Sequence, residues 1–178
     1  SLNHIVYGID NLNDYYDVNL KKNRNKKLKK FINYKFKKID ISNSKSLFNY
    51  VKDIKIDIIV NLAAQAGVRY SISHPEKYFS SNILGFFNLL DISRKKNIKH
   101  FLMASSSSVY GNTKAFKLDE TLNTDSPISF YAATKKSNEI LAYSYSSIYK
   151  IPITALRFFT VFGPYGRPDM AIHQFTKK

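Results

Sequence analysis

Short apolar runs rich in β-branched residues alternate along this chain with amphipathic segments of helical length. That alternation is typical of a parallel sheet whose strands are joined by crossover helices. The predicted strands are residues 4–10, 34–40, 56–64, 99–106 and 153–161, and the predicted helices are residues 44–52, 75–96 and 130–149. The fold class is therefore α/β.

The first predicted strand ends in an acidic residue, Asp10. In dinucleotide-binding folds an acidic residue at the end of the second strand hydrogen-bonds the ribose hydroxyls of adenosine, and it favours NAD over NADP. The glycine-rich turn of that motif lies about 20 residues upstream, which is before Ser1. The pattern predicts a doubly wound parallel sheet of Rossmann type that lacks its first strand.

The lack of that strand has a consequence for stability. In the doubly wound order 3-2-1-4-5-6 the first strand lies between the second and the fourth, so the sheet lacks its middle. Two exposed strand edges favour aggregation. We expect the 178 residues alone to be marginally stable, and a cooperative unfolding transition of a monomer would refute this.

The absence of cysteine excludes disulfide bonds, thiolate metal sites and thiol nucleophiles, and it fits a reducing compartment. No apolar run approaches the roughly 20 residues needed to cross a bilayer. The four histidines are scattered without ligand spacing. We expect a cytoplasmic protein of one domain or part of one, with no membrane span and no metal site.

The net charge of +15 is concentrated at residues 21–38, where Phe31, Tyr34 and Phe36 stand among lysines. Such a segment is compatible with a basic nucleic-acid-binding module, in which lysines follow the phosphates and aromatic rings stack on bases. The other interpretation is a solvated helix face whose aromatic side chains face the core. We favour the second interpretation and expect no specific nucleic-acid partner, because charge sign reports on solubility and non-specific attraction.

The segment "SFYAATKK" places Tyr131 and Lys135 four residues apart, on one face of the predicted helix. A free tyrosine titrates near pH 10, and a neighbouring ammonium stabilises the phenolate. The run Ser105–Ser108 follows a strand, at the sheet edge where ligands bind. Either segment alone is compatible with ordinary surface or with a turn. Together, Ser106, Tyr131 and Lys135 predict a proton relay beside a hydride acceptor.

Four segments carry a family resemblance: "GIDNLNDYYDVNLK", "NLAAQAGVRYS", "ASSSSVYG" and "LRFFTVFGPYGRPDMA". With "YAATK", they resemble the extended short-chain dehydrogenase/reductases, most closely the UDP-glucuronate 4-epimerases. The resemblance implies that residues 1–178 are part of an NAD-binding Rossmann-type domain, without the glycine-rich strand–turn–helix and the C-terminal substrate domain. This piece alone is expected to be inactive, and the longer protein to be a homodimer.

The activity implied by the resemblance is isomerisation of a UDP-sugar, through a 4-keto intermediate and re-reduction on the opposite face, in polysaccharide biosynthesis. UDP-glucuronate, giving UDP-galacturonate, is the favoured substrate, and UDP-glucose is the alternative. Ser107 and Ser108 stand before "VYG", where relatives that dehydrate or decarboxylate sugars carry an acid. The absence of an extra acid favours oxidation and re-reduction over elimination, which needs a second proton-transfer group.

Site residues are also implied by the resemblance. The catalytic set is Ser106, Tyr131 and Lys135. The NAD-binding set is Asp10, Asn11, Asp40, Ile41, Leu62, Ala63, Ala64 and Asn82, with Tyr131 and Lys135. The substrate-binding set is Gln65, Arg69, Ser107, Ser108, Thr160 and Arg167, of which Thr160 and Arg167 would hold the uronate carboxylate. A salt bridge within the loop is the alternative role for Arg167.

Overall fold

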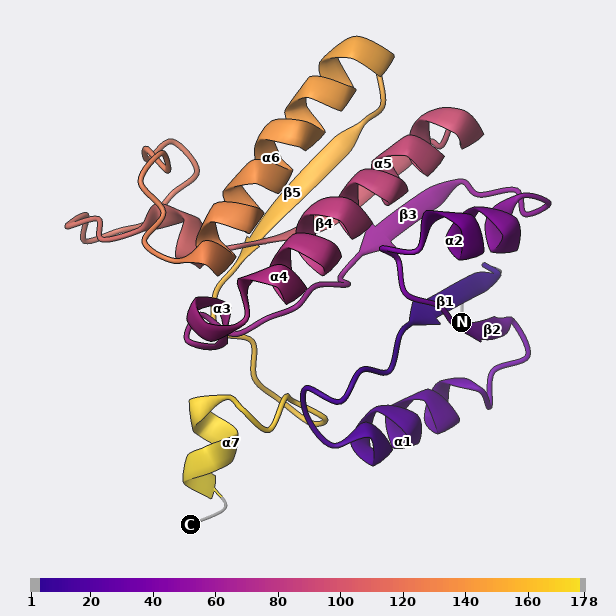
Figure 1. The fold of residues 1–178 in the computed structure, drawn as a ribbon, viewed down its shortest axis with the longest axis horizontal. Coiled ribbons are helices and arrows are strands. Elements are labelled where there is room, and N and C mark those ends of the chain that lie inside the picture. The colour runs from indigo at the N-terminus through magenta and orange to yellow at the C-terminus, as the bar shows by residue number, and fades with distance from the viewer. Residues whose placement is uncertain (1–3, 177–178) are drawn as a thin grey trace. The chain divides into compact units, whose positions relative to one another are not determined.

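The computed structural model of this chain describes residues 4–176, which divide into two compact units. Unit 1 consists of the described parts of Ser1–Asp40 and Thr160–Lys178, and unit 2 is Ile41–Phe159. Each unit is described by itself, and the elements of both are labelled in Figure 1.

Unit 1 contains β1 (Val6–Asp10), α1 (Val18–Leu28), β2 (Tyr34–Lys38) and the short α7 (Ala171–Thr176). The strands are parallel, with Val6 beside Tyr34 and Asp10 beside Lys38, as a crossover through α1 requires. The side chain of Asp17 caps α1 by accepting a hydrogen bond from the backbone N–H of Asn19 at 2.8 Å. Helix α1 buries none of its residues, and Phe31, which follows it, is 56% exposed.

Unit 2 opens with α2 (Ser44–Val51), β3 (Ile58–Asn61) and α3 (Tyr70–Ser73). The predicted helix at residues 75–96 forms as three consecutive segments, α4 (Pro75–Tyr78), the π-helix η1 (Phe79–Leu84) and α5 (Gly85–Lys96). The remaining elements are β4 (His100–Ser106), the 3₁₀ turn η2 (Ser107–Tyr110), α6 (Phe130–Tyr149) and β5 (Ile153–Phe158). Wide turns of the η1 kind are frequent at functional sites.

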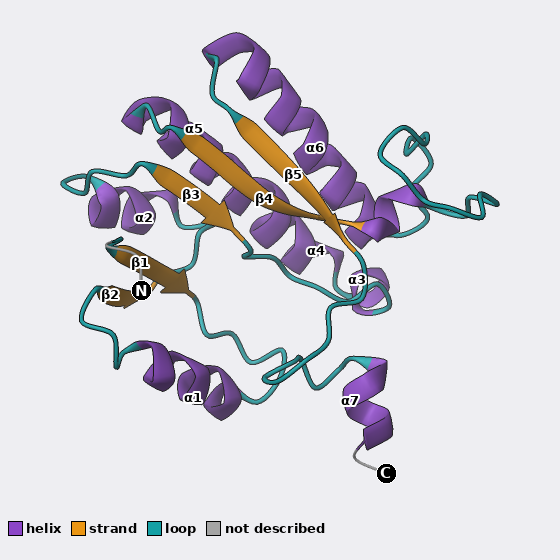
Figure 2. Ribbon diagram, turned by 180° about the vertical axis from the view of Figure 1, so that it is seen from behind, coloured by secondary structure: helices purple, strands orange, loops and turns teal. Residues whose placement is uncertain are grey.

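The three strands of unit 2 are parallel, in the order β3–β4–β5. Helices α5 and α6 cover one face of this sheet, and Figure 2 shows the opposite face. Phe101 and Met103 point from β4 toward the helices, where the rings of Phe86 and Phe101 meet edge to face at 5.8 Å. On the opposite face Ile58 and Val60 are more than half exposed.

The predicted α/β class is confirmed, and each predicted strand forms, with its ends trimmed by one to five residues. Among the described residues the strands pair as β1–β2 and as β3–β4–β5. The doubly wound order without its first strand gives these same two groups.

Candidate active site

Tyr131 and Lys135 lie in the first two turns of α6. The helix begins here because Ser129 is extended and its Oγ accepts a hydrogen bond from the N–H of Ala132 at 3.1 Å. Lys135 is only 3% exposed, and its Nζ donates to the carbonyl oxygen of Ala104 at 2.7 Å. The same Nζ lies 6.0 Å from the centroid of the Tyr131 ring. The predicted helical face is therefore present, with its lysine buried.

Burial lowers the pKa of Lys135 from 10.5 to about 8, because the ammonium loses hydration. The hydrogen bond to the Ala104 carbonyl compensates for part of that loss. A lysine with such a pKa is charged at neutral pH and loses its proton under mildly alkaline conditions.

The serine run turns the chain at the carboxyl end of β4. Ser106 Oγ accepts a hydrogen bond from the N–H of Ser108 at 3.1 Å, and it also donates to Ser108 Oγ at 3.1 Å. Ser106 therefore caps the turn η2, so the serine run does form a turn, as one of the two interpretations of this segment expected. Because Lys135 is bound to Ala104, the first turns of α6 lie at this end of β4, where Ser106 stands.

Asn82 in η1 links the loop after β3 to α6. Its side-chain oxygen accepts from the N–H of Gln65 at 2.8 Å, and its Nδ2 donates to the Gln65 carbonyl and to Thr134 Oγ1, both at 3.0 Å. Thr134 Oγ1 in turn donates to the carbonyl oxygen of Tyr131 at 2.8 Å. Asn82 is 1% exposed. The network therefore holds Tyr131 against the loop that bears Gln65.

Tyr78 is a neighbour of Tyr131 that the sequence analysis missed. It is fully buried, and its ring meets the Tyr131 ring edge to face at 6.1 Å. Its hydroxyl donates to the carbonyl oxygen of Ala66 at 2.8 Å. This contact orients the Tyr131 ring and leaves its hydroxyl unused by the packing.

Other predicted residues of unit 2 have mixed surroundings. Leu62, Ala63 and Arg69 are exposed, and Ala64 is half-buried. Gln65 is 5% exposed, and its Nε2 donates to the Ala66 carbonyl at 3.3 Å. Ile41 is 7% exposed, and it packs so closely on Gly85 that a Cβ there would lie 2.6 Å from Ile41 Cγ1. Ile41 thus belongs to the core of unit 2.

A partly buried ion pair lies one turn beyond Lys135. Glu139 on α6 accepts two hydrogen bonds from the guanidinium of Arg157 on β5. The Nε–Oε1 and Nη2–Oε2 distances are both 3.0 Å. Ser105 Oγ donates to Glu139 Oε1 at 2.5 Å, and Arg157 also donates to the Tyr110 hydroxyl at 3.3 Å. Burial alone would raise the pKa of Glu139, but the hydrogen bonds from Arg157 and Ser105 outweigh it and lower the pKa.

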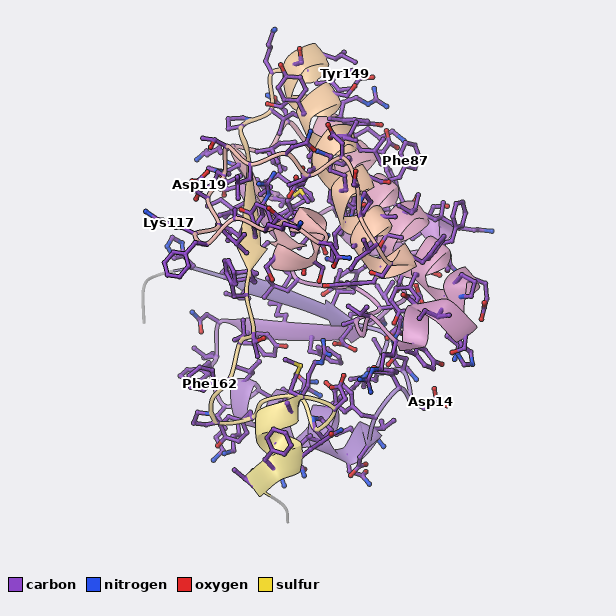
Figure 3. The ribbon with its side chains drawn as sticks, turned by 90° about the vertical axis from the view of Figure 1, so that its left-hand side faces the viewer. Asp14, Phe87, Lys117, Asp119, Tyr149 and Phe162 are labelled. Atoms are coloured by element: carbon purple, nitrogen blue, oxygen red, sulfur yellow. The ribbon has the colours of Figure 1, made fainter. Side chains whose placement is uncertain are left out.

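The pair also borders a cavity of about 460 Å³, which is lined by residues of β5 and of the loop after η2. Asp119 belongs to that loop and is labelled in Figure 3, on the side of unit 2 away from Phe87. Glu139 and Arg157 were not predicted from the sequence, because they become neighbours only through the pairing of Ser105 with Arg157 in the sheet.

Glu139→Gln is expected to lower the free energy of unfolding of the protein encoded by the whole gene by about 1–2 kcal/mol, because it leaves a partly buried guanidinium without its counter-charge. Denaturant unfolding measures this. The stability that Glu139 contributes is present above its ordinary pKa of 4.5 and is lost as the pH falls through the lowered folded value.

Asp91→Asn is the matched control, because Asp91 pairs with Arg94 and Lys95 whose side chains are 40% and 44% exposed. Its cost should stay below about 1 kcal/mol. If both variants lose the same free energy of unfolding, the pair of Glu139 and Arg157 contributes no more to stability than an exposed surface pair.

Unit 1 brings together three of the predicted NAD-binding residues. Asp10 ends β1 and is exposed, and its Oδ1 accepts from the N–H of Leu12 at 2.6 Å. Asn11 Nδ2 donates to Asp40 Oδ2 at 2.9 Å. Two carboxylates and an amide therefore gather at the carboxyl ends of β1 and β2, where a parallel sheet binds ligands.

The predicted carboxylate-binding residues Thr160 and Arg167 also belong to unit 1. Thr160 is exposed. Arg167 forms a salt bridge with Asp169 at 2.6 Å. The alternative role considered for Arg167 is thus present in the structure.

Among residues 4–176 no three histidine, aspartate or glutamate side chains are grouped closely enough to hold a metal ion. No helix within that range is both long and apolar enough to span a bilayer.

Comparisons with known proteins identify the family and agree on the fold. The family model described as GDP-mannose 4,6 dehydratase matches residues 1–178. Protein CapI of Staphylococcus aureus is 52% identical over 98% of this chain and 52% of its own length. UDP-glucuronate 4-epimerase of Thermodesulfobacterium geofontis is 47% identical over 97% of this chain and 53% of its own length.

Among solved structures, UDP-glucuronic acid 4-epimerase from Bacillus cereus, in complex with UDP-glucuronic acid and NAD, is similar with a TM-score of 0.89. It is 36% identical, and the match covers 98% of this chain and 54% of that one. The chain spans about half the length of the curated relatives it matches.

Proposed function

This chain belongs to the GDP-mannose 4,6 dehydratase family, and from that premise we propose that it is part of the NAD-binding domain of a nucleotide-sugar 4-epimerase. The proposed reaction interconverts UDP-glucuronate and UDP-galacturonate. The observation that carries the proposal is the buried ammonium of Lys135 beside Tyr131, at the strand end that bears Ser106. The similarity to proteins named UDP-glucuronate 4-epimerase supports the choice of substrate.

The residues present fit NAD. Asp10 and Asn11 offer oxygen and amide groups for the adenosine ribose, Asp40 stands beside them, and the exposed Leu62 and Ala63 follow β3. A carboxylate at Asp10 would repel the 2′-phosphate of NADP. When bound, NAD supplies a hydride acceptor and donor for C4 of the sugar.

The chain's own residues then handle the proton. Tyr131, as phenolate, takes the proton of the 4-hydroxyl while the C4–H bond is oxidised, which leaves a 4-keto sugar. The ammonium of Lys135 stabilises the phenolate, and Ser106 donates a hydrogen bond to the sugar oxygen. After the sugar turns over, Tyr131 would give the proton back to the sugar oxygen as C4 is reduced on its other face. No cofactor is consumed.

The serine loop favours epimerisation over the dehydration after which the family is described. Ser107 and Ser108 occupy the positions before Val109, and Ser108 Oγ accepts a hydrogen bond from Ser106. Neither hydroxyl is a general acid for elimination of water. Both remain suitable hydrogen-bond donors to a sugar carboxylate, together with Thr160 and Arg167, while Gln65 and Arg69 would face the sugar.

We propose in addition that the longer protein is a homodimer that pairs through its helices. Apolar side chains project from η1, α5 and α6, with Leu84, Phe87, Ile140 and Tyr143 between 42% and 79% exposed. Figure 3 shows Phe87 on the helical side of unit 2. Apolar surface of this kind is one of the features that a partner subunit covers.

A substrate comparison tests the proposal. The protein encoded by the whole gene is incubated separately with UDP-glucuronate and with UDP-glucose, and the products are separated by anion-exchange chromatography. We expect UDP-galacturonate, with a kcat/KM several-fold above that for UDP-glucose, because the uronate carboxylate can accept hydrogen bonds from Thr160, Arg167 and the serine loop that a neutral sugar does not receive. A preference for UDP-glucose, or a dehydrated product, would overturn the proposal.

A further inference from the structure

The guanidinium of Arg167 is engaged by a carboxylate of its own loop. Nε donates to Asp169 Oδ1 at 3.0 Å and Nη2 donates to Oδ2 at 2.6 Å, so the contact is bidentate. The side chains of Arg167 and Asp169 are 33% and 28% exposed. A planar fork of this kind is also how an arginine binds the carboxylate of a ligand.

Asp169 is held in place from a second direction. The hydroxyl of Tyr15, in the segment between β1 and α1, donates to Asp169 Oδ2 at 3.2 Å. Burial alone would raise the pKa of Asp169, but the hydrogen bonds from Arg167 and Tyr15 and the charge of Arg167 lower it overall. Asp169 is therefore a carboxylate at neutral pH, of the same charge and shape as the carboxylate of a uronate.

The loop that bears this pair is fastened to α1. Arg24 Nη2 donates to the carbonyl oxygen of Gly166 at 2.9 Å, and its Nη1 donates to the Tyr16 hydroxyl at 2.8 Å. Lys27 contacts the hydroxyl of Tyr165. Within unit 1 the loop before Arg167 is therefore held by the contacts of Gly166 and Tyr165 with α1. Its partner Asp169 is held by the hydrogen bond from Tyr15.

We infer that Asp169 competes with the substrate's carboxylate for the guanidinium of Arg167. The inference rests on the proposed function, in which Arg167 binds the uronate. A uronate that binds the Nε–Nη2 edge of the guanidinium displaces Asp169 from it, so one ion pair is exchanged for another and the net gain in affinity is small. A neutral sugar leaves the pair intact and gains nothing from Arg167.

Such an exchange suits an epimerase. The 4-keto sugar must break its contacts with the protein before its other face can be reduced. Stronger binding of the carboxylate would stabilise one bound orientation of the sugar without lowering the barrier to epimerisation. While the sugar turns, Asp169 pairs again with the guanidinium of Arg167. The guanidinium therefore has a carboxylate partner at every stage of the reaction.

Asp169→Asn tests the inference, because asparagine keeps the shape and the contact with Tyr15 but removes the charge. Binding is measured by titration calorimetry on the whole-gene protein in a Tyr131→Phe background, which prevents turnover. We expect the Kd for UDP-glucuronate to fall about 3- to 10-fold and the Kd for UDP-glucose to stay the same. Asp14→Asn is the matched control, since Asp14 is exposed, lies in the same unit and carries the same charge (Figure 3).

Each outcome decides between accounts. An unchanged Kd in Asp169→Asn would overturn the competition, and a raised Kd would show instead that Asp169 positions Arg167. Equal tightening in Asp14→Asn would reduce the effect to net charge and overturn it too. Should Asp169→Asn fail to fold, Tyr15→Phe weakens the hold on Asp169, and a smaller fall in Kd is expected. Failure of the parent protein to bind UDP-glucuronate would refute the proposed function itself.

Discussion

Tyr131→Phe is expected to lower kcat for 4-epimerisation by about 10²- to 10⁴-fold, the usual contribution of a positioned general base. The substitution removes only the hydroxyl. The edge-to-face contact with Tyr78 at 6.1 Å remains, as does the hydrogen bond from Thr134 to the carbonyl oxygen at residue 131. Substrate affinity and the unfolding temperature should therefore change little. Steady-state kinetics, titration calorimetry and thermal unfolding of the whole-gene protein measure the three quantities.

Tyr149→Phe provides the control for this variant. Tyr149 is the last residue of the same helix and is 44% exposed, so the loss of its hydroxyl should leave kcat unchanged. Retention of kcat within a few-fold in Tyr131→Phe would remove Tyr131 from the proton transfer.

Lys135→Met is expected to lower kcat by a similar order, about 10²- to 10³-fold, and at the same time to stabilise the fold near neutral pH. The pKa of Lys135 is about 8 in the folded protein and 10.5 in the unfolded chain. This difference means that keeping the buried ammonium charged lowers the free energy of unfolding by about 3 kcal/mol. Methionine removes that cost, but it leaves the Ala104 carbonyl without its donor, which costs about 1 kcal/mol or more. The net gain at pH 7 is on the order of 1–2 kcal/mol.

The pH dependence of the stability separates this account from a general packing effect. Between pH 8 and 10.5 the unfolded parent chain binds more protons at Lys135 than the folded one, so the parent's free energy of unfolding rises with pH in that window. In Lys135→Met this rise is absent, and the advantage of the variant disappears by the end of the window. The parent's activity should fall above about pH 8, as Lys135 loses its charge.

Lys136→Met is the matched control for activity. Lys136 bonds Thr124 and Asp125 instead of the strand end, so its loss should leave kcat unchanged. The same rise in stability between pH 8 and 10.5 in the parent and in Lys135→Met would contradict the assigned burial of the charge.

The sequence predicted correctly those elements that are determined by neighbouring residues, such as a helix with its own cap and apolar spacing. Helix α6 begins at Phe130 as expected, because Ser129 caps it and the apolar spacing continues to Tyr149.

Helix α1 was expected only as a solvated helix face within residues 21–38 and received no bounds of its own, since it is polar on every side and buries none of its residues. The expectation that the aromatic side chains of this segment face the core is wrong for Phe31, which is 56% exposed. The neighbours of α1 include Gly166 and Tyr165, more than a hundred residues away along the chain.

The same distinction holds for the site. Spacing alone placed Tyr131 and Lys135 on one helical face. It did not show that Lys135 is bound to Ala104 or that Tyr78 contacts Tyr131, because those contacts depend on how the helices and strands pack. The pair of Glu139 and Arg157 depends in addition on the register of β5 against β4. The NAD-binding role of Ile41 remains a prediction, and its burial against Gly85 gives it a packing role as well.

Transfer of a label at C4 tests the central claim most directly. UDP-glucuronate carrying deuterium at C4 is incubated with the whole-gene protein, without added NAD, and the product is examined by proton NMR and mass spectrometry. The account predicts UDP-galacturonate that keeps the deuterium at C4, because the same hydride is removed and returned while Tyr131 exchanges only the hydroxyl proton. Loss of the deuterium to water, or failure to form UDP-galacturonate, would contradict it.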